Sequence, residues 1–570
     1  MTRSHLQPRR PVAVEAPPTT PAGDGHPPKA PATTASVAVL IVTWNRWEMA
    51  DRVLAAIARQ SHDPSRLEVV IIDNASSDGT TDELVARWSP ERLVDNPTQA
   101  ALEPRFAPRV TGRRNAAGFG SMTIIRNGSN LGGCGGFNTG LAWTQHRAAS
   151  EPGFNPDFVW LVDDDVDLPT DALAQLVSAA NADPSLGLVG SRTCDIDDRA
   201  RTIETTVYLN PDTGLMADEP SPAHPLHESH RQWTATVGGT KGGTGYTGLR
   251  PVDVVSACSL LARWSAVEQV GLWDGRYFIY CDDADWSLRF ARAGWGVALN
   301  LDAVVYHTPW HHKLTLARLY YAQRNLLWML RKTLPAERVR PVLRERLSGL
   351  LRESLKAALM RRLTHAELIR RSVSDAIGNR GGKLSHQAPP TVTLKEAIER
   401  FSARNPAQLA FLCNRPACQG WADQLKQGLT QAASEAHRPA PAWTRLVRND
   451  LSPQPRGDER TIVYSLRRRS RLRRQLPLWF HRPTAAVVFD NGNDFPLLSG
   501  RWTLHADPKD LSRVMIEPNR LRDRLAFGAR WGWTLLRAAW FLLMLPKLPA
   551  PQSASFDRVE KAPGDGAATA

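Results

Sequence analysis

The sequence is poor in cysteine and has no long apolar run. Six cysteines among 570 residues are too few and too scattered for a disulfide-stapled fold, and they indicate a reducing compartment. No stretch reaches the roughly 18 uninterrupted apolar residues that a membrane-spanning helix needs. Residues 1–35 contain eight prolines and no apolar segment typical of a secretory signal, so they are predicted to be a disordered tail. The protein is therefore expected to be cytoplasmic.

Acidic residues are outnumbered by basic ones. The chain has 71 Lys and Arg against 57 Asp and Glu, which gives a net charge of +14. This surplus favours anionic partners such as nucleotide phosphates or lipid headgroups. No motif that reads nucleic acid accompanies the charge, so we expect no nucleic acid as a partner. The hydrophobic share of 42% is that of a globular protein and excludes a chain that is disordered throughout.

Short apolar strands alternate with helical patterns as far as residue 307. The predicted strands are residues 36–43, 67–73, 122–127 and 157–162. This alternation predicts an α/β fold with a parallel, doubly wound sheet. Two long interruptions, residues 89–121 and 195–250, are expected to be functional lids or disordered loops.

The character of the sequence changes after residue 312, which predicts a helical segment and a small second α/β unit. The expected organisation is an α/β domain over 36–312, a basic helical segment over 313–380, a linker over 381–390, a small α/β unit over 391–525, an amphipathic helix over 526–550 and a disordered tail over 551–570. The clearest strands of the second unit are 409–414 and 485–491.

Polar side chains gather where the predicted strands end, which is where open parallel sheets bind ligands. Strand 157–162 is followed by Asp163, Asp164 and Asp165, and three adjacent carboxylates repel one another unless a cation neutralises them. Backbone alternation would point Asp163 and Asp165 to the same side, so that both could hold one ion. The alternative is a set of acids that favours the start of the next helix.

A second acidic cluster and a histidine follow further along. Asp282, Asp283 and Asp285 lie where a loop meets a helix; capping accounts for one of them, and another is a candidate general base. His307 ends the strand predicted over 295–307. It is either a core histidine or, with two carboxylates, a ligand for Mn²⁺ or a similar ion.

A glycine-rich stretch, NLGGCGGFN at 130–138, opens a predicted helix. Its four glycines allow a ligand to approach the backbone closely, and a helix N-terminus favours anions. The GK[ST] signature of a P-loop is missing, and no GxGxxG follows the first strand. Taken alone, the stretch does not identify a ligand.

Seven stretches in this order resemble the inverting family 2 glycosyltransferases of the GT-A fold, and among these the bacterial galactofuranosyltransferases that build cell-wall galactan. The stretches are VAVLIVTWNR (37–46), VVIIDNASSDGT (69–80), NLGGCGGFN (130–138), VWLVDDDV (159–166), FIYCDDADWSLRFARAGW (278–295), VVYH (304–307) and YYAQRNLL (320–327). The resemblance implies a Rossmann-like sheet that binds a nucleotide-sugar.

The resemblance also implies roles for individual residues. Asp163, Asp165 and His307 would hold Mn²⁺ or Mg²⁺ against the donor diphosphate. Asp283 would be the general base and Asp282 would orient the acceptor. The implied substrate-binding residues are Thr43, Asn45, Arg46, Asp73, Asn130, Gly132, Gly133, Asp164 and Trp286. Among these, Asp73 would bind the uracil of a UDP-sugar.

The implied activity is metal-dependent, inverting transfer of galactofuranose from UDP-galactofuranose to a cell-envelope glycan or a polyprenyl-linked acceptor. Rhamnose transfer from dTDP-rhamnose is the alternative, and a non-catalytic sugar-nucleotide-binding scaffold is a second. In the strand expected over 254–264, Cys258 and Ser259 stand where the galactan polymerases have aromatic residues. The donor sugar and the acceptor therefore stay open.

Two C-terminal segments suggest contact with an anionic membrane surface. Residues 465–482 place six Arg between 467 and 474, ahead of Trp479 and Phe480. Trp531, Trp533, Trp540 and Phe541 lie in the predicted amphipathic helix and would form an interfacial anchor. The alternative is a solvated basic face and a buried terminal helix. We accordingly expect a cytoplasmic protein that is peripheral on the inner face of the membrane if this contact forms. The sequence leaves open whether the protein forms a homo-oligomer.

Overall fold

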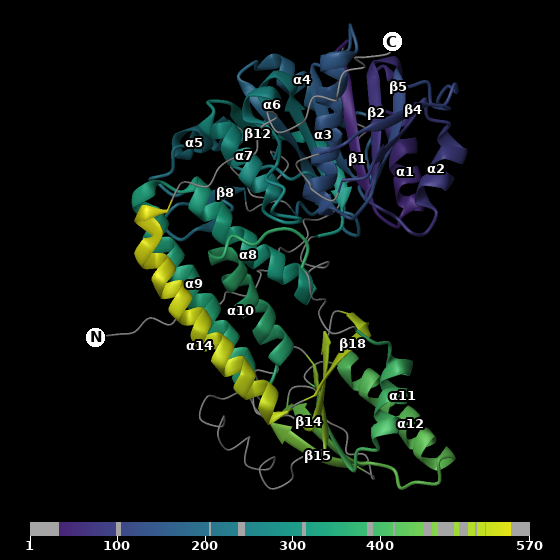
Figure 1. The fold of residues 1–570 in the computed structure, drawn as a ribbon, viewed down its shortest axis with the longest axis vertical. Helices are drawn as coiled ribbons and strands as arrows, with labels where there is room; N and C mark the ends of the chain where they lie inside the picture. Colours follow the sequence, from purple (N-terminus) through teal and green to yellow (C-terminus); the bar gives the residue numbers. More distant parts are fainter. Residues whose placement is uncertain are drawn as a thin grey trace, which may run out of the picture.

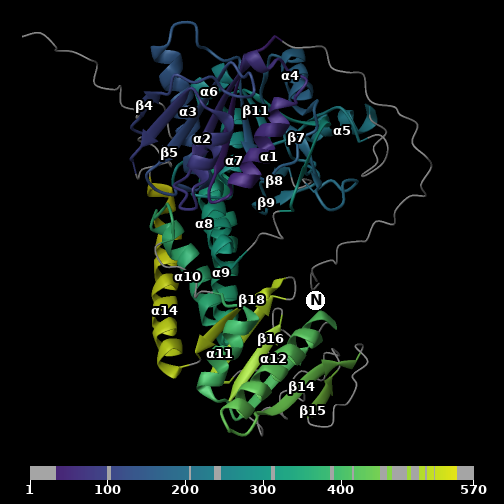
Figure 2. The same cartoon turned by 90° about the vertical axis from the view of Figure 1, so that its right-hand side faces the viewer.

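The structure, a computed structural model, describes most of the chain. The described residues are 34–98, 104–203, 207–236, 246–309, 315–384, 391–413, 416–449, 459–464, 484–489, 500–507, 510–518 and 520–548. They form a large α/β unit, a small α/β unit and a group of long helices between the two (Figure 1). Figure 2 shows the same arrangement after a quarter turn.

The large sheet has ten strands in the order β10-β12-β7-β11-β6-β1-β2-β5-β3-β4. In chain order they are β1 (Val37–Thr43), β2 (Leu67–Asp73), β3 (Arg92–Asn96), β4 (Ala107–Val110), β5 (Ser121–Asn127), β6 (Phe158–Asp163), β7 (Leu186–Asp195), β10 (Leu249–Pro251), β11 (Ser259–Arg263) and β12 (Gly296–His307). β1 pairs in parallel with both β2 and β6, whereas β11 runs antiparallel between β6 and β7. The strand order therefore reverses beside β1, where a sheet of this kind opens a crevice for ligands.

Helices cover both faces of this sheet. They are α1 (Trp47–Ala58), α2 (Thr80–Trp88), α3 (Gly132–Ser150), α4 (Ala172–Ala182), α6 (Trp264–Val270) and α7 (Asp282–Arg292). Along β1, Ala38 and Leu40 join the core on the α3 side, while Val39 and Ile41 join the core on the α1 side. Because both faces are buried, the strand is one continuous apolar run, as is typical of parallel sheets. The predicted doubly wound α/β fold is confirmed.

The two long interruptions of the pattern contain regular structure in their described parts, which corrects the prediction that they are disordered loops. Residues 89–121 include β3 and β4, which form one edge of the large sheet. Residues 195–250 include β8 (Tyr208–Asn210), β9 (Leu215–Ala217) and α5 (His227–Thr236). The strands among these elements are only three to five residues long, so their sequences carry little periodicity. The strand predicted over 254–264 is also shorter, because only Ser259–Arg263 pairs with its neighbours.

Four long helices pack together beside the large unit. They are α8 (Leu316–Thr333), α9 (Ala336–Leu359), α10 (Leu363–Ile377) and α14 (Leu521–Met544). α14 begins before residue 526, where the amphipathic helix was expected. One of its faces packs against α9 and α10: Phe527 is buried beside Ala357 and Ala366, and the Trp531 indole donates to the Leu351 carbonyl at 3.0 Å.

The small unit is a six-stranded sheet in the order β15-β14-β13-β16-β17-β18. Its strands are β13 (Gln408–Cys413), β14 (Ala442–Arg448), β15 (Glu459–Tyr464), β16 (Ala485–Phe489), β17 (Trp502–Asp507) and β18 (Asp510–Pro518), and its helices are α11 (Leu394–Arg404) and α12 (Pro416–Glu435). All neighbouring pairs are parallel except β17 with β18. The Arg-rich segment 465–482 lies outside the described residues.

Candidate functional site

Two carboxylates and an imidazole meet at the carboxyl ends of β6 and β12. His307 Nε2 lies 3.0 Å from Asp165 Oδ1 and 3.7 Å from Asp163 Oδ2. One ligand atom from each of the three residues lies within 4.8 Å of the other two. The Asp163 side chain is 40% exposed, whereas the side chains of Asp165 and His307 are mostly buried. Two oxygen donors and one nitrogen donor with an open side fit a divalent cation such as Mn²⁺ or Mg²⁺.

Asp164 turns away from this triad, as backbone alternation predicted. The Thr43 hydroxyl donates to its Oδ2 at 2.8 Å, and Arg46 Nη1 lies 3.2 Å from its Oδ1. Burial raises the pKa of Asp164 to about 6, against the opposing charge of Arg46. The same Arg46 nitrogen lies 3.3 Å from Asp165 Oδ2. This arginine therefore joins the loop after β1 to the acids after β6.

Asp282 and Asp283 begin helix α7, and the negative charge of Asp163 contributes to the raised pKa of each. Asp283 accepts the N–H of Ala284 at 2.8 Å and the backbone N–H of Ala257. Burial raises its pKa to about 6, and the negative charge of Asp163 contributes to the rise. Burial also raises the pKa of Asp282 well above its usual value, again with a contribution from Asp163. The two acidic clusters of the sequence therefore converge into one site.

The loop that leads into α7 has an unusual backbone. Phe278, Tyr280 and Cys281 have φ values of 69°, 70° and 61°, a left-handed region that side chains other than glycine rarely adopt. Such conformations cost free energy and persist only where neighbours hold them. This loop positions Asp282 and Asp283, so what holds it also positions the acids.

Two neighbouring side chains of α8 hold that loop. Asn325 Nδ2 lies within hydrogen-bond distance of the carbonyl oxygens of Tyr277, Ile279 and Tyr280, at 2.8 to 2.9 Å. Arg324, which is 1% exposed, donates to the Tyr277 carbonyl at 2.9 Å and stacks beside aromatic rings of its own helix. Sequence reasoning assigned neither residue a role, although both lie in the stretch YYAQRNLL (320–327).

A buried ion-pair network lies behind the acids and ties α8 to α7. Lys332 Nζ lies 3.0 Å from Asp274 Oδ2 and 2.8 Å from Asp285. Arg289 also pairs with Asp285, which is 0% exposed. Asp285, the third acid of its cluster, is therefore neutralised within the protein and supports α7 from inside.

The start of α3 packs directly against the same loop. Gly132 has a φ of 76°, and a Cβ there would lie 2.0 Å from the Phe278 carbonyl oxygen, so only glycine fits. Asn130 Oδ1 accepts the Gly132 N–H at 2.9 Å, and Asn74 donates to the Gly132 carbonyl at 2.9 Å. A Cβ on Gly133, in contrast, would meet open space. Gly133 is thus the point where this turn opens outward.

The loops after β1 and β2 interlock at the same edge. Asn45 donates its N–H to the Ser76 hydroxyl and accepts the Ser77 N–H, both at 2.8 Å. Asp73 is 4% exposed; one of its oxygens accepts the Ser76 N–H at 2.8 Å and the other accepts the Thr81 hydroxyl. The structure thus brings Asp73 to the edge as the support of this loop, with both oxygens already accepting internal hydrogen bonds.

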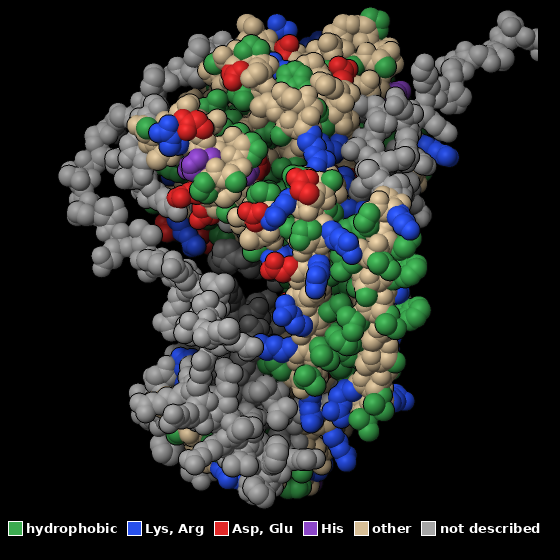
Figure 3. Space-filling view, turned by 90° about the vertical axis from the view of Figure 1, so that its left-hand side faces the viewer, with side chains coloured by type: hydrophobic (Ala, Val, Ile, Leu, Met, Phe, Trp, Pro, Cys, Tyr) green, Lys and Arg blue, Asp and Glu red, His purple; other side chains and the backbone are tan. Residues whose placement is uncertain are grey.

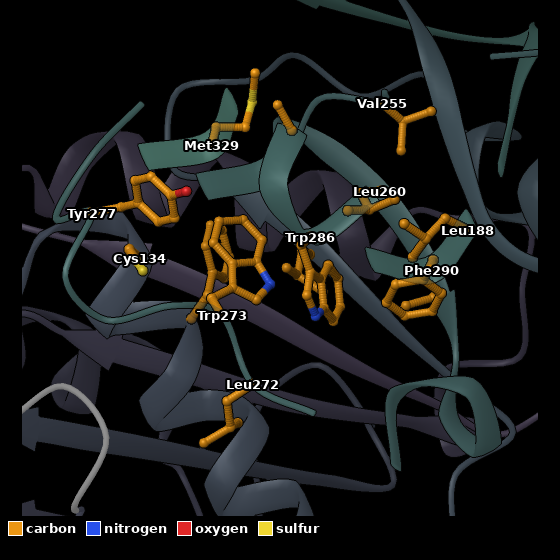
Figure 4. Close-up of a cluster of buried hydrophobic side chains, with 14 of the residues drawn as sticks. Cys134, Leu188, Val255, Leu260, Leu272, Trp273, Tyr277, Trp286, Phe290 and Met329 are labelled. Atoms are coloured by element: carbon orange, nitrogen blue, oxygen red, sulfur yellow. The ribbon is translucent and has the colours of Figure 1, made fainter. Parts of the chain in front are cut away.

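Trp286 was expected in the substrate site, and the structure corrects this expectation. The side chain is 0% exposed, and its indole donates to the Gly271 carbonyl at 2.9 Å. It packs between Trp273 and Phe290 in the core (Figure 4). Trp286 therefore stabilises the core beneath α7 and offers no exposed ring to a substrate.

Comparisons with known proteins show what this chain is similar to. A family model described as "Glycosyltransferase like family 2" matches residues 34–329, more than half of the chain. An N-acetylglucosaminyl-diphospho-decaprenol L-rhamnosyltransferase of Mycobacterium tuberculosis is 28% identical over 277 residues, which cover 48% of this chain and 76% of the relative. The range that the family model matches contains both acidic clusters, His307 and the α8 residues that hold the loop.

Similar solved structures include two chains with TM-scores below 0.5. A mannosyltransferase from Pyrobaculum calidifontis, in complex with GDP-Man and Mn²⁺, is 16% identical with a TM-score of 0.34; the match covers 71% of this chain and 88% of that one. S. aureus TarS is 12% identical with a TM-score of 0.36, covering 70% of this chain and 55% of its own.

Proposed function

The chain belongs to the glycosyltransferase-like family 2, and we propose that this member is a metal-dependent, inverting enzyme that uses a nucleoside-diphosphate sugar. The observation that carries the proposal is the convergence of the two acidic clusters. The triad of Asp163, Asp165 and His307 supplies metal ligands, and Asp163 is close enough to raise the pKa of Asp283. A transferase that displaces a diphosphate needs both functions at one point.

Asp283 is the proposed general base. A pKa of about 6 keeps its carboxylate ionised at neutral pH and still basic enough to take a proton. It would accept the proton of the acceptor hydroxyl as that oxygen bonds to the anomeric carbon and the bond to the diphosphate oxygen breaks. Direct displacement of this kind inverts the configuration. Asp282, mostly buried beside it, would orient the acceptor.

Asp163, Asp165 and His307 would hold Mn²⁺ or Mg²⁺. When bound, the ion supplies positive charge that stabilises the departing diphosphate. The donor would lie across the edge formed by the loops after β1, β2 and β6. We assign Thr43, Asn45, Arg46, Asp73, Asn130, Gly132, Gly133 and Asp164 to this donor site. Asp73 and Gly132 act by shaping the loops, since both are buried.

The donor sugar has two candidates. The sequence motifs resemble galactofuranosyltransferases, which favours UDP-galactofuranose. The relative from Mycobacterium tuberculosis is by name a rhamnosyltransferase with a lipid-linked acceptor, which favours dTDP-rhamnose. The resemblance of the motifs and the similarity to this relative both favour a cell-envelope acceptor. We propose a glycan or polyprenyl-linked acceptor that the enzyme reaches at the inner face of the membrane. Among the described residues, no helix is long and apolar enough to cross a bilayer.

Calorimetric titration of UDP and dTDP, each with and without Mn²⁺, tests the proposal. We expect nucleotide binding that depends on Mn²⁺, with the tighter nucleotide identifying the donor class. Nucleotide binding that does not depend on Mn²⁺ would show that the triad is not part of the donor site. If neither nucleotide binds in the presence of Mn²⁺, the chain is not a working transferase of this kind.

A further inference from the structure

Helix α14 has an apolar face that nothing in the described part of the chain covers. Six large apolar residues along it are each 59–66% exposed: Leu521, Leu525, Trp533, Leu536, Trp540 and Leu543. Their spacing of three to eight residues follows the helical repeat, so they form one stripe along the helix. We call this stripe the outer face of α14.

The outer face is not needed to hold α14 in place. The opposite side already packs against the neighbouring helices through Phe527, Trp531, Thr534 and Ala538. A helix that is apolar on two sides is normally buried on both. The outer face therefore has the character of a binding surface, and exposed apolar stripes of this size mark such surfaces.

Basic side chains accompany the outer face. α14 contains four Arg and one Asp, and the adjoining α9 contains six Lys and Arg against three Glu. Arg522 and Arg530 are 74% and 50% exposed. The end of α9 adds exposed Leu355 and Leu359. Figure 3 shows hydrophobic side chains along these helices with Lys and Arg side chains beside them.

We propose that the outer face of α14, with the end of α9, docks on the surface of an anionic phospholipid bilayer. A 24-residue helix is about 36 Å long and can lie flat at the headgroup level, with its apolar side chains among the acyl chains. Exposed Trp rings suit this interface, and each Arg near anionic headgroups adds to the binding. This surface gives the partner implied by a lipid-linked acceptor, so in that respect it rests on the proposed function.

The charge around the face favours a bilayer over a second copy of the chain. In a symmetric dimer the same patch meets itself, which would bring the arginines of both copies together. Anionic headgroups offer opposite charge along the whole edge. Docking on a bilayer depends on the lipid concentration, whereas dimerisation depends on the protein concentration, so the two can be told apart by experiment.

Flotation of the full-length protein with vesicles tests the proposal. Vesicles of phosphatidylglycerol and phosphatidylcholine in equal parts should bind the wild type at least about tenfold more tightly than pure phosphatidylcholine, and added salt should weaken the binding. A combined Trp533→Ser, Leu536→Ser and Trp540→Ser variant should lose at least about tenfold in affinity. Val110→Ser is the matched control, since Val110 is 79% exposed on β4, away from α14.

Quenching by brominated lipids provides the second readout. The double variant Trp533→Phe and Trp540→Phe should still float with the vesicles, but much of the quenching of tryptophan fluorescence should disappear. Equal binding by the triple Ser variant and the wild type would overturn the proposal. A lipid-free wild-type dimer that the triple variant dissociates would assign the face to a second copy instead.

Nucleotide titration and vesicle binding together distinguish a failure of this proposal from a failure of the proposed function. Mn²⁺-dependent nucleotide titration of the triple variant should match the wild type, because the outer face is not part of the donor site. Intact titration with no vesicle binding would reject only the docking surface. Vesicle binding with no nucleotide binding would reject only the transferase.

Discussion

Buried charges are treated in opposite ways in the two α/β units. In the small unit, the Glu459 carboxylate accepts hydrogen bonds from Arg445 at 2.7 Å and from Lys426 at 2.8 Å. Burial alone would raise the pKa of Glu459, but these two charged donors outweigh burial and lower it. At the edge of the large sheet, burial and the negative charge of Asp163 raise the pKa of Asp283 to about 6. Acids that the fold neutralises serve architecture, whereas acids left without enough cations indicate a ligand that supplies positive charge.

The same contrast appears within α7 itself. Asp285 is neutralised by Lys332 and Arg289, while Asp283, two residues earlier, lies next to further acids. One helix thus has an architectural acid inside and a chemical acid at its start. The following predictions run from the largest expected effect to the smallest.

The largest effect is expected at the proposed base. Asp283→Asn keeps the shape but cannot accept a proton, so turnover should fall by about 10³-fold, equivalent to ~4 kcal/mol. Mn²⁺-dependent nucleotide affinity should stay within about threefold of the wild type, because the metal ligands are unchanged. Transfer assays and calorimetry on the same preparation measure both. Turnover close to that of the wild type would assign the base elsewhere.

Arg445→Met tests the architectural side of the comparison. Removing this cation leaves the buried Glu459 with Lys426 alone, so the free energy of unfolding should fall by about 3 kcal/mol. Nucleotide binding at the large sheet should not change under conditions where the variant is folded. Denaturant titration gives the stability. An unchanged midpoint would show that the small unit does not depend on this pairing.

Asp165→Asn tests the metal triad. Losing one of three ligands should weaken Mn²⁺-dependent nucleotide binding by about 30-fold, within the range seen when metal sites are disturbed. Asp167→Asn is the matched control, since Asp167 lies two residues further on and its side chain pairs with Arg199 outside the triad. Calorimetry with and without Mn²⁺ compares them. Equal losses in both variants would show a general effect on the loop.

Asn325→Ala tests the support of the strained loop. Without the amide, the carbonyls of Tyr277, Ile279 and Tyr280 lose their shared donor, so the acids should be less well placed. We expect kcat to fall by about tenfold with little change in nucleotide affinity. Asn325→Gln should not restore the rate, because the longer side chain cannot place its amide nitrogen at the same point between the three carbonyl oxygens. A loss in affinity alone would indicate a different role.

Much of the large sheet could be predicted from the sequence, and so could the grouping of its acids. β1, β2, β5 and β6 are apolar runs buried on both faces, and such runs are visible without tertiary information. Asp163 and His307 end β6 and β12, and Asp165 follows β6 by two residues, so the topology brings the three together. The strands β3, β8 and β9 were missed because three to five residues are too few to show a periodic pattern.

Other features depend on contacts that no local pattern contains. Trp286 was predicted to bind substrate, but it is packed in the core against the side chains of Trp273 and Phe290. Asn325 serves a loop more than forty residues earlier in the chain, so its role appears only in the folded protein.

The pH dependence of transfer tests the central claim most directly. If Asp283 is the base, its carboxylate must be ionised, and its pKa of about 6 sets the transition. We predict that kcat/KM rises about tenfold per pH unit below pH 6 and levels off above it, and that the residual rate of Asp283→Asn lacks this transition. A wild-type rate that is flat from pH 5 to 8, or a variant that keeps the same transition, would contradict the account.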